Sequence, residues 1–389
     1  MSLDILIRRF AYGIIALYDR WTQKRPLDKA PFAISRILMT ELTKIGDVLV
    51  TTPVAKAIKN HYPNAQITYI AKDCSVDIFR HNSHVDHVIG FRNGKGPGPM
   101  LRTLAQARHE RPDLAISLSP GLKNAVVTHL CGARYKVGYL NDRSKRPHFY
   151  SDHPIEARGF RSGVSICYYK DEHLTTRAAK AVLPLDVKCS GEPVDFPIGF
   201  EAQARADALL KEGNLRIVVH PSSGWPFKSW PEDRFIGLLS RIKSHFRGSP
   251  LQIILLGGHH DSQLLTRINR SLDGDLTVVK GSPLPVAGAV IRGSHLFVGN
   301  DSGPLHMAEA FKIPFVGIFG PSFPETTGPL SSGVFVSKQV PCAPCAQTVC
   351  LRAAQGLPTC MELIDVETVF RAVLESLNDQ PSVSRRHPA

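Results

Sequence analysis

Apolar and polar positions repeat in the same order in two halves of the chain. Short apolar runs, which predict buried strands, alternate with longer segments whose apolar positions recur every three or four residues, which predict helices. In the first half we expect strands at 34–39, 66–70, 85–89 and 114–118, and helices around 48–61 and 100–108. In the second half we expect strands at 215–219, 252–256, 277–279, 296–298 and 315–318, and helices around 233–245, 262–271 and 285–291. This alternation predicts an α/β fold with two doubly wound, Rossmann-like domains whose parallel sheets have right-handed crossovers.

Glycine and proline mark the boundary between the two halves. The stretch 189–200 contains Gly191, Pro193, Pro197 and Gly199, which predicts a linker over 189–212. The remaining parts are then an extension at 1–31, domains at 32–188 and 213–378, and a disordered tail at 379–389. Ligands of open α/β sheets bind beyond the carboxyl ends of the strands. Two such domains that face each other therefore predict a site in a central cleft.

The N-terminal extension has a pattern of its own. Its apolar residues recur at helical spacing, namely Leu3, Ile7, Phe10, Ile14, Leu17 and Trp21. An amphipathic helix of this kind suits an anionic membrane surface, and packing against the body of the protein is the alternative. The extension does not match a signal peptide, and no apolar run in the chain reaches the roughly 18 residues of a membrane span.

Composition and charge narrow the choice of partners. The content of 43% hydrophobic and 21% charged residues is typical of a soluble globular protein. The net charge of +13 indicates an anionic partner, such as a nucleotide, an acidic glycan or an anionic membrane surface, unless it serves solubility alone. Because the basic residues are scattered, without a dense run, we expect no nucleic-acid partner.

The most informative motif runs from Val298 to His306. The apolar run 296–298 leads into Asp301-Ser302-Gly303, which in turn precedes a helical segment. A strand that ends at the start of a helix presents free backbone N–H groups and a positive dipole end, which favour phosphate. Ser302 is expected to cap the helix, Gly303 to let a ligand approach the backbone, and His306 to add a donor. An ordinary helix cap beside a packed histidine is the alternative.

A second strand-end loop runs from His220 to Pro231. Ser222 and Gly224 suit a loop that wraps phosphate with hydroxyl and backbone donors, and Lys228 supplies a point charge for a diphosphate. The loop lacks the Walker pattern, and a surface loop before a helix is the alternative.

The first strand is followed by a loop that contains two carboxylates. Gly46 predicts a tight turn that places Asp47 at the start of the next helix, where the helix dipole stabilises its charge. Asp47 is therefore a candidate general base, and a plain N-cap is the alternative. Glu41 has no assigned role at this level.

Two further strand ends carry polar or small residues. Asp261, after Gly257 and Gly258, is a candidate for binding ribose hydroxyls, and Gly320 lies in the loop after the last expected strand. His259 and His260 are adjacent and lack a spaced third ligand, so we expect no metal there.

The eight cysteines fall into two groups. Cys74, Cys131, Cys167 and Cys189 are dispersed, as is typical of reduced cytosolic thiols. The other four, Cys342, Cys345, Cys350 and Cys360, are clustered and are candidates for a structural zinc site or for reduced, packed thiols. Their spacing lacks paired Cys-x-x-Cys knuckles, which favours packed thiols.

Taken together, these motifs resemble glycosyltransferase family 9, the lipopolysaccharide heptosyltransferases. The matching motifs are Lys44-x-Gly46-Asp47 followed by Pro53, Lys228-x-Trp230-Pro231, Asp301-Ser302-Gly303-x-x-His306 and Gly317-x-x-Gly320-Pro321. They occur in order over about 34–370. The resemblance implies a GT-B fold in which the domain at 213–378 binds an ADP-heptose donor and the domain at 32–188 binds the acceptor. It implies an inverting, metal-independent transfer, without a cofactor, to an acidic lipid-linked sugar at the cytoplasmic face of the inner membrane.

The resemblance also implies residue roles. Asp47 would be the general base, Lys228 would stabilise the ADP leaving group, and Lys44 and Gly46 would belong to the acceptor-side loop. The donor would be bound by Ser222, Gly224, Asp261, Asp301, Ser302, Gly303, His306 and Gly320. Two alternatives remain: a GT-B transferase or epimerase that uses another nucleotide sugar, and a non-catalytic relative that binds nucleotide or glycolipid. Selective binding of ADP would separate the first alternative from the heptosyltransferase.

Overall fold

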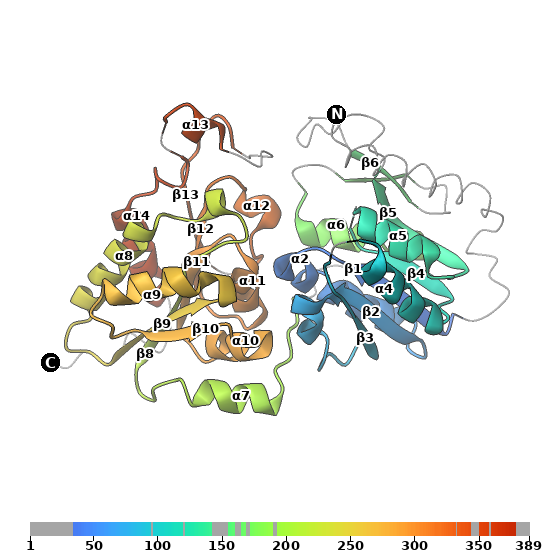
Figure 1. Ribbon diagram of the computed structural model, residues 1–389, viewed down its shortest axis with the longest axis horizontal. Helices are drawn as coiled ribbons and strands as arrows, with labels where there is room; N and C mark the ends of the chain where they lie inside the picture. Colours follow the sequence, from blue (N-terminus) through green and yellow to red (C-terminus); the bar gives the residue numbers. More distant parts are fainter. Residues whose placement is uncertain are drawn as a thin grey trace. The chain divides into compact units, whose positions relative to one another are not determined.

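The chain divides into two compact units between Pro197 and Ile198 (Figure 1). The computed structural model describes residues 34–94, 96–119, 121–141, 155–159, 165–168, 172–189, 193–331, 333–343, 350–357 and 359–378. The predicted extension at 1–31, the predicted tail at 379–389 and Cys345 lie outside the described residues.

The first unit is built on a parallel sheet. Its parallel strands are β1 (Arg36–Glu41), β2 (Gln66–Lys72), β3 (His87–Phe91), β4 (Leu114–Ser117) and β5 (Tyr135–Asn141). Two antiparallel strands, β6 (Ile155–Gly159) and β7 (Ser165–Tyr168), extend the sheet. Among the described residues the strand order is β3-β2-β1-β4-β5-β6-β7. Every residue of the central strand β1 after Arg36 is buried. Its apolar residues Ile37, Leu38 and Met39 are consecutive because both faces of a parallel sheet are covered.

Helices connect the strands of the first unit. They are α2 (Ile45–Leu49), α3 (Thr52–His61), the 3₁₀ segment η2 (Asp73–Ile78), α4 (Gly98–His109), α5 (Leu122–Leu130), α6 (Leu174–Lys180) and the 3₁₀ segment η3 (Leu183–Leu185). The single helix expected at 48–61 is divided into α2 and α3. Pro53 occupies the second position of α3, where a missing N–H is tolerated, whereas inside a continuous helix it would clash with the preceding turn. One core of this unit packs α4 and α5 against the sheet through Leu104, Val127 and Ile70.

The second unit has a fully parallel sheet over its described residues. Its strands are β8 (Leu215–His220), β9 (Leu251–Gly257), β10 (Thr277–Lys280), β11 (Leu296–Asn300), β12 (Phe315–Phe319) and β13 (Val334–Ser337). They are ordered β10-β9-β8-β11-β12-β13. The longer helices are α8 (Glu232–His245), α9 (Ser262–Arg270), α10 (Leu284–Arg292), α11 (Gly303–Ala310) and α14 (Val366–Asn378). The short ones are η4 (Pro226–Lys228), η5 (His259–Asp261), α12 (Pro324–Thr327) and α13 (Leu351–Ala354).

Helices cover both faces of the second sheet. Helices α8, α9 and α14 share one core with the strands, centred on Phe235, Leu265 and Val373, all fully buried. Helices α10 and α11 pack together, and α11 also contacts β11 and β12. Both units are therefore doubly wound α/β domains, which confirms the predicted fold class.

The boundary between the two units falls within the predicted linker at 189–212, and part of that stretch is helical. Residues Phe200–Asp207 form helix α7, which packs against α10 of the second unit and buries Ala206. Segment 193–197 belongs to the first unit, where Asp195 accepts a hydrogen bond from Asn82 and its backbone N–H donates to Thr52. The glycines and prolines of this stretch precede α7, but the contacts of α7 with α10 hold residues 200–207 in a helix.

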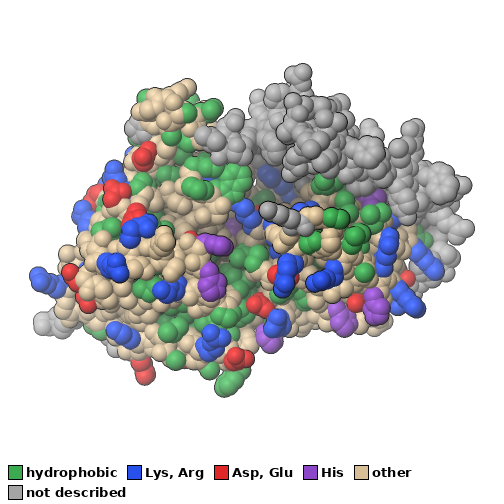
Figure 2. All heavy atoms as spheres, viewed as in Figure 1, with side chains coloured by type: hydrophobic (Ala, Val, Ile, Leu, Met, Phe, Trp, Pro, Cys, Tyr) green, Lys and Arg blue, Asp and Glu red, His purple; other side chains and the backbone are tan. Residues whose placement is uncertain are grey.

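Charged side chains are spread over the visible surface. Figure 2 shows Lys and Arg interspersed with Asp and Glu on the face it presents, without a continuous basic track. Within the described ranges, no helix combines the length and apolar character that a membrane crossing requires.

Candidate active site

Both sheets reverse their strand order next to their first strand. The reversal lies between β1 and β4 in the first unit and between β8 and β11 in the second. Ligands of doubly wound folds bind beyond the carboxyl ends of the strands at such a point. In each unit the predicted residues follow one of these strands: Asp47 comes after β1, Lys228 after β8 and Asp301 after β11.

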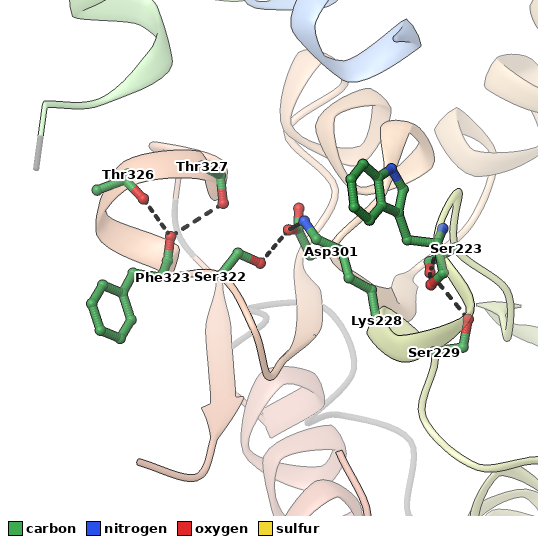
Figure 3. Close-up of polar contacts among 9 residues, drawn as sticks. Ser223, Lys228, Ser229, Asp301, Ser322, Phe323, Thr326 and Thr327 are labelled. Atoms are coloured by element: carbon green, nitrogen blue, oxygen red, sulfur yellow. Dashed lines mark hydrogen bonds and ion pairs between the residues drawn. The ribbon is translucent and has the colours of Figure 1, made fainter. Parts of the chain in front are cut away.

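An ion pair joins the two predicted phosphate-binding segments of the second unit. Lys228 Nζ lies 2.6 Å from Asp301 Oδ2, and the two side chains are 25% and 10% exposed. Ser322, in the loop after β12, donates a hydrogen bond to the same carboxylate oxygen. Figure 3 shows Lys228 and Ser322 reaching Asp301 from different sides. Because an ammonium has three N–H donors, Lys228 can hold Asp301 and still donate to a ligand.

The loop that carries Lys228 is fixed by its own hydrogen bonds. Ser223 Oγ donates to the Trp225 carbonyl at 2.6 Å and contacts Ser229 Oγ at 3.0 Å (Figure 3). The backbone N–H of Lys228 donates to the same Trp225 carbonyl. The stem of Lys228 is therefore held at its base, and Gly224 lies exposed within the loop.

Asn300 connects this loop to the sheet, although the sequence suggested no role for it. Its Nδ2 donates to the carbonyls of Pro221 and Ser222, at 3.0 and 3.2 Å, and its Oδ1 accepts the Trp230 N–H at 2.9 Å. The side chain is fully buried. Both ends of the Lys228 loop are thereby tied to the end of β11.

The start of α11 presents polar groups without a completed cap. Ser302 occupies the N-cap position as predicted, but its hydroxyl does not make the expected capping hydrogen bond. Among the described residues, Ser302 Oγ is one of the buried side-chain atoms without a hydrogen-bond partner. Gly303 opens the helix, and its neighbour Pro304 has no N–H. An unsatisfied buried hydroxyl at a helix N-terminus suits an anionic acceptor.

His306 is held by an acidic residue one turn further on. Its Nδ1 lies 3.3 Å from Glu309 Oε2, and Glu309 Oε1 accepts the Leu330 N–H at 2.7 Å. Both side chains are buried. Because the carboxylate accepts a hydrogen bond, it fixes Nδ1 of the ring as a donor. Glu309 was not predicted; its spacing of three residues from His306 on one helix was the available signal.

The end of β8 contributes a buried neutral histidine. Nδ1 of His220 donates to the Leu256 carbonyl at 2.8 Å, which leaves Nε2 to accept from Ser222 Oγ at 3.4 Å. Burial lowers the pKa of His220, although the hydrogen bond to the Leu256 carbonyl and the charge of Asp261 oppose the shift. Asp261 itself accepts the Gly258 N–H at 2.7 Å and so closes the turn after β9.

Gly320 lies in close contact with the side chains of Met361 and Cys360. A Cβ at this position would lie 2.3 Å from Met361 Sδ and 2.9 Å from Cys360 Sγ. A larger residue at Gly320 would therefore require the Met361 and Cys360 side chains to shift, whether or not a donor binds there.

In the first unit, Asp47 lies in the first turn of α2. Its Oδ2 accepts the Lys44 N–H at 3.2 Å, so the carboxylate closes the helix start from within the helix. Gly46 is part of α2 and does not form the predicted turn before it. Asp47 is half-buried and Lys44 is exposed.

Glu41 is the carboxyl group most perturbed by its surroundings in this region. It is 1% exposed at the end of β1. Burial raises the pKa of Glu41 to about 7; the charge of Asp47 adds to the rise, whereas hydrogen bonds from Thr43, Ser119 and Asn124 oppose it. The sequence placed Glu41 in the same loop as Asp47 but did not reveal its burial.

The described cysteines do not form a metal centre. Within the described part of the chain, no group of three or more His, Cys, Asp or Glu side chains is arranged to hold a metal ion. Cys342, Cys350 and Cys360 are free thiols. Burial raises the pKa of Cys360 to about 11, and the nearby Cys350 and Cys342 add to the rise, so its sulfur is a thiol at neutral pH.

A separate cavity of about 490 Å³ lies beside β3, away from these residues. Its lining includes Asp73 and Asp86, which pair with Arg92 and Lys59. None of the predicted site residues lines it.

Comparison with known proteins decides the family. The family model described as glycosyltransferase family 9 (heptosyltransferase) matches residues 100–354, which is more than half of the chain. The chain belongs to glycosyltransferase family 9. It is therefore a glycosyltransferase, and its two Rossmann-like units are those of the GT-B enzymes of this family.

Relatives and solved structures agree with this family. Lipopolysaccharide heptosyltransferase 3 from Escherichia coli is 24% identical over 288 residues, which cover 71% of this chain and 80% of that protein. The structure of a family 9 glycosyl transferase from Veillonella parvula superimposes with a TM-score of 0.72 at 20% identity and covers 90% of this chain and 99% of that one. ADP-heptose lps heptosyltransferase II from E. coli superimposes with a TM-score of 0.68 at 18% identity, over 88% and 98% of the two chains.

Proposed function

We propose that this family 9 enzyme transfers a heptose from ADP-heptose to a lipid-linked lipopolysaccharide core acceptor, with inversion at the transferred carbon. The observation that carries the proposal is the ion pair of Lys228 with Asp301 beside the unpartnered Ser302 hydroxyl at the start of α11. A cation, a hydroxyl donor and a helix N-terminus converge there, as a diphosphate requires.

In this proposal the second unit holds the leaving group. Negative charge grows on the diphosphate as the bond between the sugar and the phosphate breaks. Lys228 donates to that charge while Asp301, which also accepts from Ser322, keeps its ammonium in place. Donors that are already oriented contribute more in the transition state than mobile ones, because little reorganisation is needed.

Asp47 acts on the acceptor side. Its carboxylate takes the proton from the acceptor hydroxyl, whose oxygen then forms the new bond to the anomeric carbon. The bond from that carbon to the ADP oxygen breaks on the opposite face, which inverts the configuration. Asp47 is partly exposed and its orientation is set by the Lys44 N–H, as a general base needs.

The substrate assignment rests on the relatives and on charge. The name of the E. coli enzyme whose fold matches includes ADP-heptose, and that of the E. coli relative includes lipopolysaccharide. The net charge of +13 suits an acidic, lipid-linked acceptor and peripheral contact with the cytoplasmic face of the inner membrane. The family match begins at residue 100, so the role of Asp47 is supported by its loop motif and its geometry instead.

Nucleotide binding tests the donor. Calorimetric titration of the protein with ADP, UDP and GDP, each with EDTA present, should show selective binding of ADP. ADP-heptose and a panel of truncated lipopolysaccharides should then yield a heptosylated product and free ADP. Preference for UDP or GDP would assign another donor to the same fold. Binding of none of the three by the folded protein would indicate a non-catalytic relative.

A further inference from the structure

A buried carboxyl group that the proposed transfer step does not use ends the strand before the loop that leads to the proposed base. Glu41 ends β1 and is 1% exposed. Burying a carboxyl group costs free energy unless hydrogen bonds compensate it. Its contacts therefore show which part of the structure it stabilises.

Three hydrogen bonds from Thr43 and Ser119 reach one oxygen atom of Glu41. Oε1 accepts from the Thr43 backbone N–H at 3.1 Å, from Thr43 Oγ1 at 2.7 Å and from Ser119 Oγ at 2.9 Å. Two of the three donors belong to the loop between β1 and α2. The third belongs to the loop after β4, the neighbouring strand at the point where the strand order reverses.

Asn124 closes this network from α5. Its Oδ1 accepts the Leu42 N–H at 2.9 Å, and its Nδ2 donates to Ser119 Oγ at 2.8 Å. Asn124 is 1% exposed. The backbone of residues 42 and 43 is thus held by buried side chains on both sides.

The next backbone N–H in the chain belongs to Lys44, and it donates to Asp47 Oδ2 at 3.2 Å. We propose that Glu41 is the positioning residue of Asp47: it anchors the loop whose Lys44 N–H orients the Asp47 carboxylate toward the acceptor hydroxyl. This inference rests on the proposed function, in which Asp47 is the base. A misplacement of about 1 Å at a reacting group can cost up to ~10²-fold in rate.

Because all three hydrogen bonds are accepted by Oε1, the anchoring role of Glu41 can be tested separately from its negative charge. A protonated carboxyl group, or an amide, still offers Oε1 as an acceptor. Glu41→Gln should therefore keep the anchor, whereas Glu41→Leu, of similar size, removes it. Glu110→Gln is a matched control, because Glu110 accepts a hydrogen bond from Thr68 in the same unit without contacting this loop.

The experiment measures ADP release from ADP-heptose with a truncated lipopolysaccharide acceptor. We expect Glu41→Leu to lower kcat by about 10- to 100-fold, with KM for both substrates and the Kd for ADP unchanged within about 2-fold. Glu41→Gln and Glu110→Gln should retain kcat within about 3-fold. An unchanged kcat in Glu41→Leu, or an equal loss in Glu41→Gln, would overturn the inference.

Hydrogen exchange of the Lys44 amide gives a readout that does not depend on transfer. It should be at least about 10-fold faster in Glu41→Leu than in the wild type or Glu41→Gln, with α3 equally protected in all three. Equal exchange would overturn the anchor even if no acceptor in the panel is a substrate.

Two further variants distinguish a wrong role for Glu41 from a wrong assignment of the base. If Glu41→Leu does not fold, the double variant Thr43→Val, Ser119→Ala removes two donors to Oε1 and should lower kcat in the same way; an unchanged kcat would refute the anchor. Asp47→Asn tests the proposed base directly. If Asp47→Asn abolishes transfer while Glu41→Leu retains it, the role of Glu41 is wrong and the proposed function stands. Full activity in Asp47→Asn would refute the base, and with it the role of Glu41.

Discussion

At the scale of single residues, the charge on Lys228 is the feature closest to the proposed chemistry. Its ammonium lies 2.6 Å from Asp301, and the pair is only partly exposed. The low exposure weakens competition from water, so the charge acts more strongly on a bound diphosphate than a surface lysine would.

Replacing Lys228 should therefore slow transfer more than it weakens binding. We expect Lys228→Ala to lower kcat by ~10²-fold or more, because the leaving group loses its cationic partner in the transition state. Steady-state kinetics with ADP-heptose measures this loss. Lys243→Ala is the control, since Lys243 pairs with Asp275 far from the β8–β11 strand ends. A near-normal kcat in Lys228→Ala would exclude the proposed role.

Burial of Glu41 predicts a pH dependence of stability. Its pKa is about 7 in the folded protein against an ordinary value of 4.5. Because the folded pKa is raised, the favourable contribution is complete below about pH 4.5 and is lost as the pH rises through about 7. Glu41→Gln has no such loss. The difference in free energy of unfolding, variant minus wild type, should thus grow by up to about 3 kcal/mol between pH 4.5 and 8. Denaturant unfolding at several pH values measures it, and a constant difference would contradict the burial.

Several site residues were predictable because of their places in the sequence. Lys228 and Asp301 follow apolar runs, and strand ends are where ligands bind in this fold class. Ser322 and Asn300 were not assigned, because their roles depend on partners remote in the chain, whereas Glu309 was missed although its partner His306 is three residues away. Ser322 lies 21 residues from Asp301, and Asn300 lies 79 from Pro221.

At the scale of elements, the strand β11 and the loop after β8 act together. Asn300 connects them through three hydrogen bonds, all buried. The Lys228 loop contains only the short helix η4, so its shape depends on its own hydrogen bonds and on those from Asn300.

Asn300→Ala should release this loop. It leaves the Trp230 N–H and two carbonyls without their partner, which costs about 1–3 kcal/mol for each group that water does not reach. We expect lower stability in thermal unfolding and a weaker affinity for ADP in calorimetry. The comparison variant is Asn82→Ala, which removes a partly buried bond to Asp195 in the first unit. Unchanged ADP affinity in Asn300→Ala would show that the loop keeps its shape without this side chain.

Differences between predicted and observed elements have local causes. Pro53 ends the continuous helix expected at 48–61, a signal that was present in the sequence. Helix α7 lies within the predicted linker because its packing against α10 compensates for the flanking glycine and proline. The antiparallel strands β6 and β7 were not predicted from apolar runs.

At the scale of the whole molecule, the two units have separate cores and separate proposed roles. The Lys228 site lies in the second unit, and the Glu41 network with Asp47 lies in the first. The membrane-binding role of residues 1–31 stays a prediction, since they lie outside the described residues. The net charge of +13 favours anionic partners without selecting one.

The fold class, the family and the strand ends that carry the candidate site all followed from the amino-acid sequence. Hydrophobic periodicity and motif order are properties of neighbouring residues, so they can be read without coordinates. Which of these residues are buried, and which groups hydrogen-bond to them, became known only from the folded chain. Glu41 meets Ser119 across 78 residues because β1 and β4 are adjacent in the sheet. The depth of a carboxyl group and the donors around it follow from strand order, and only the folded sheet brings those groups together.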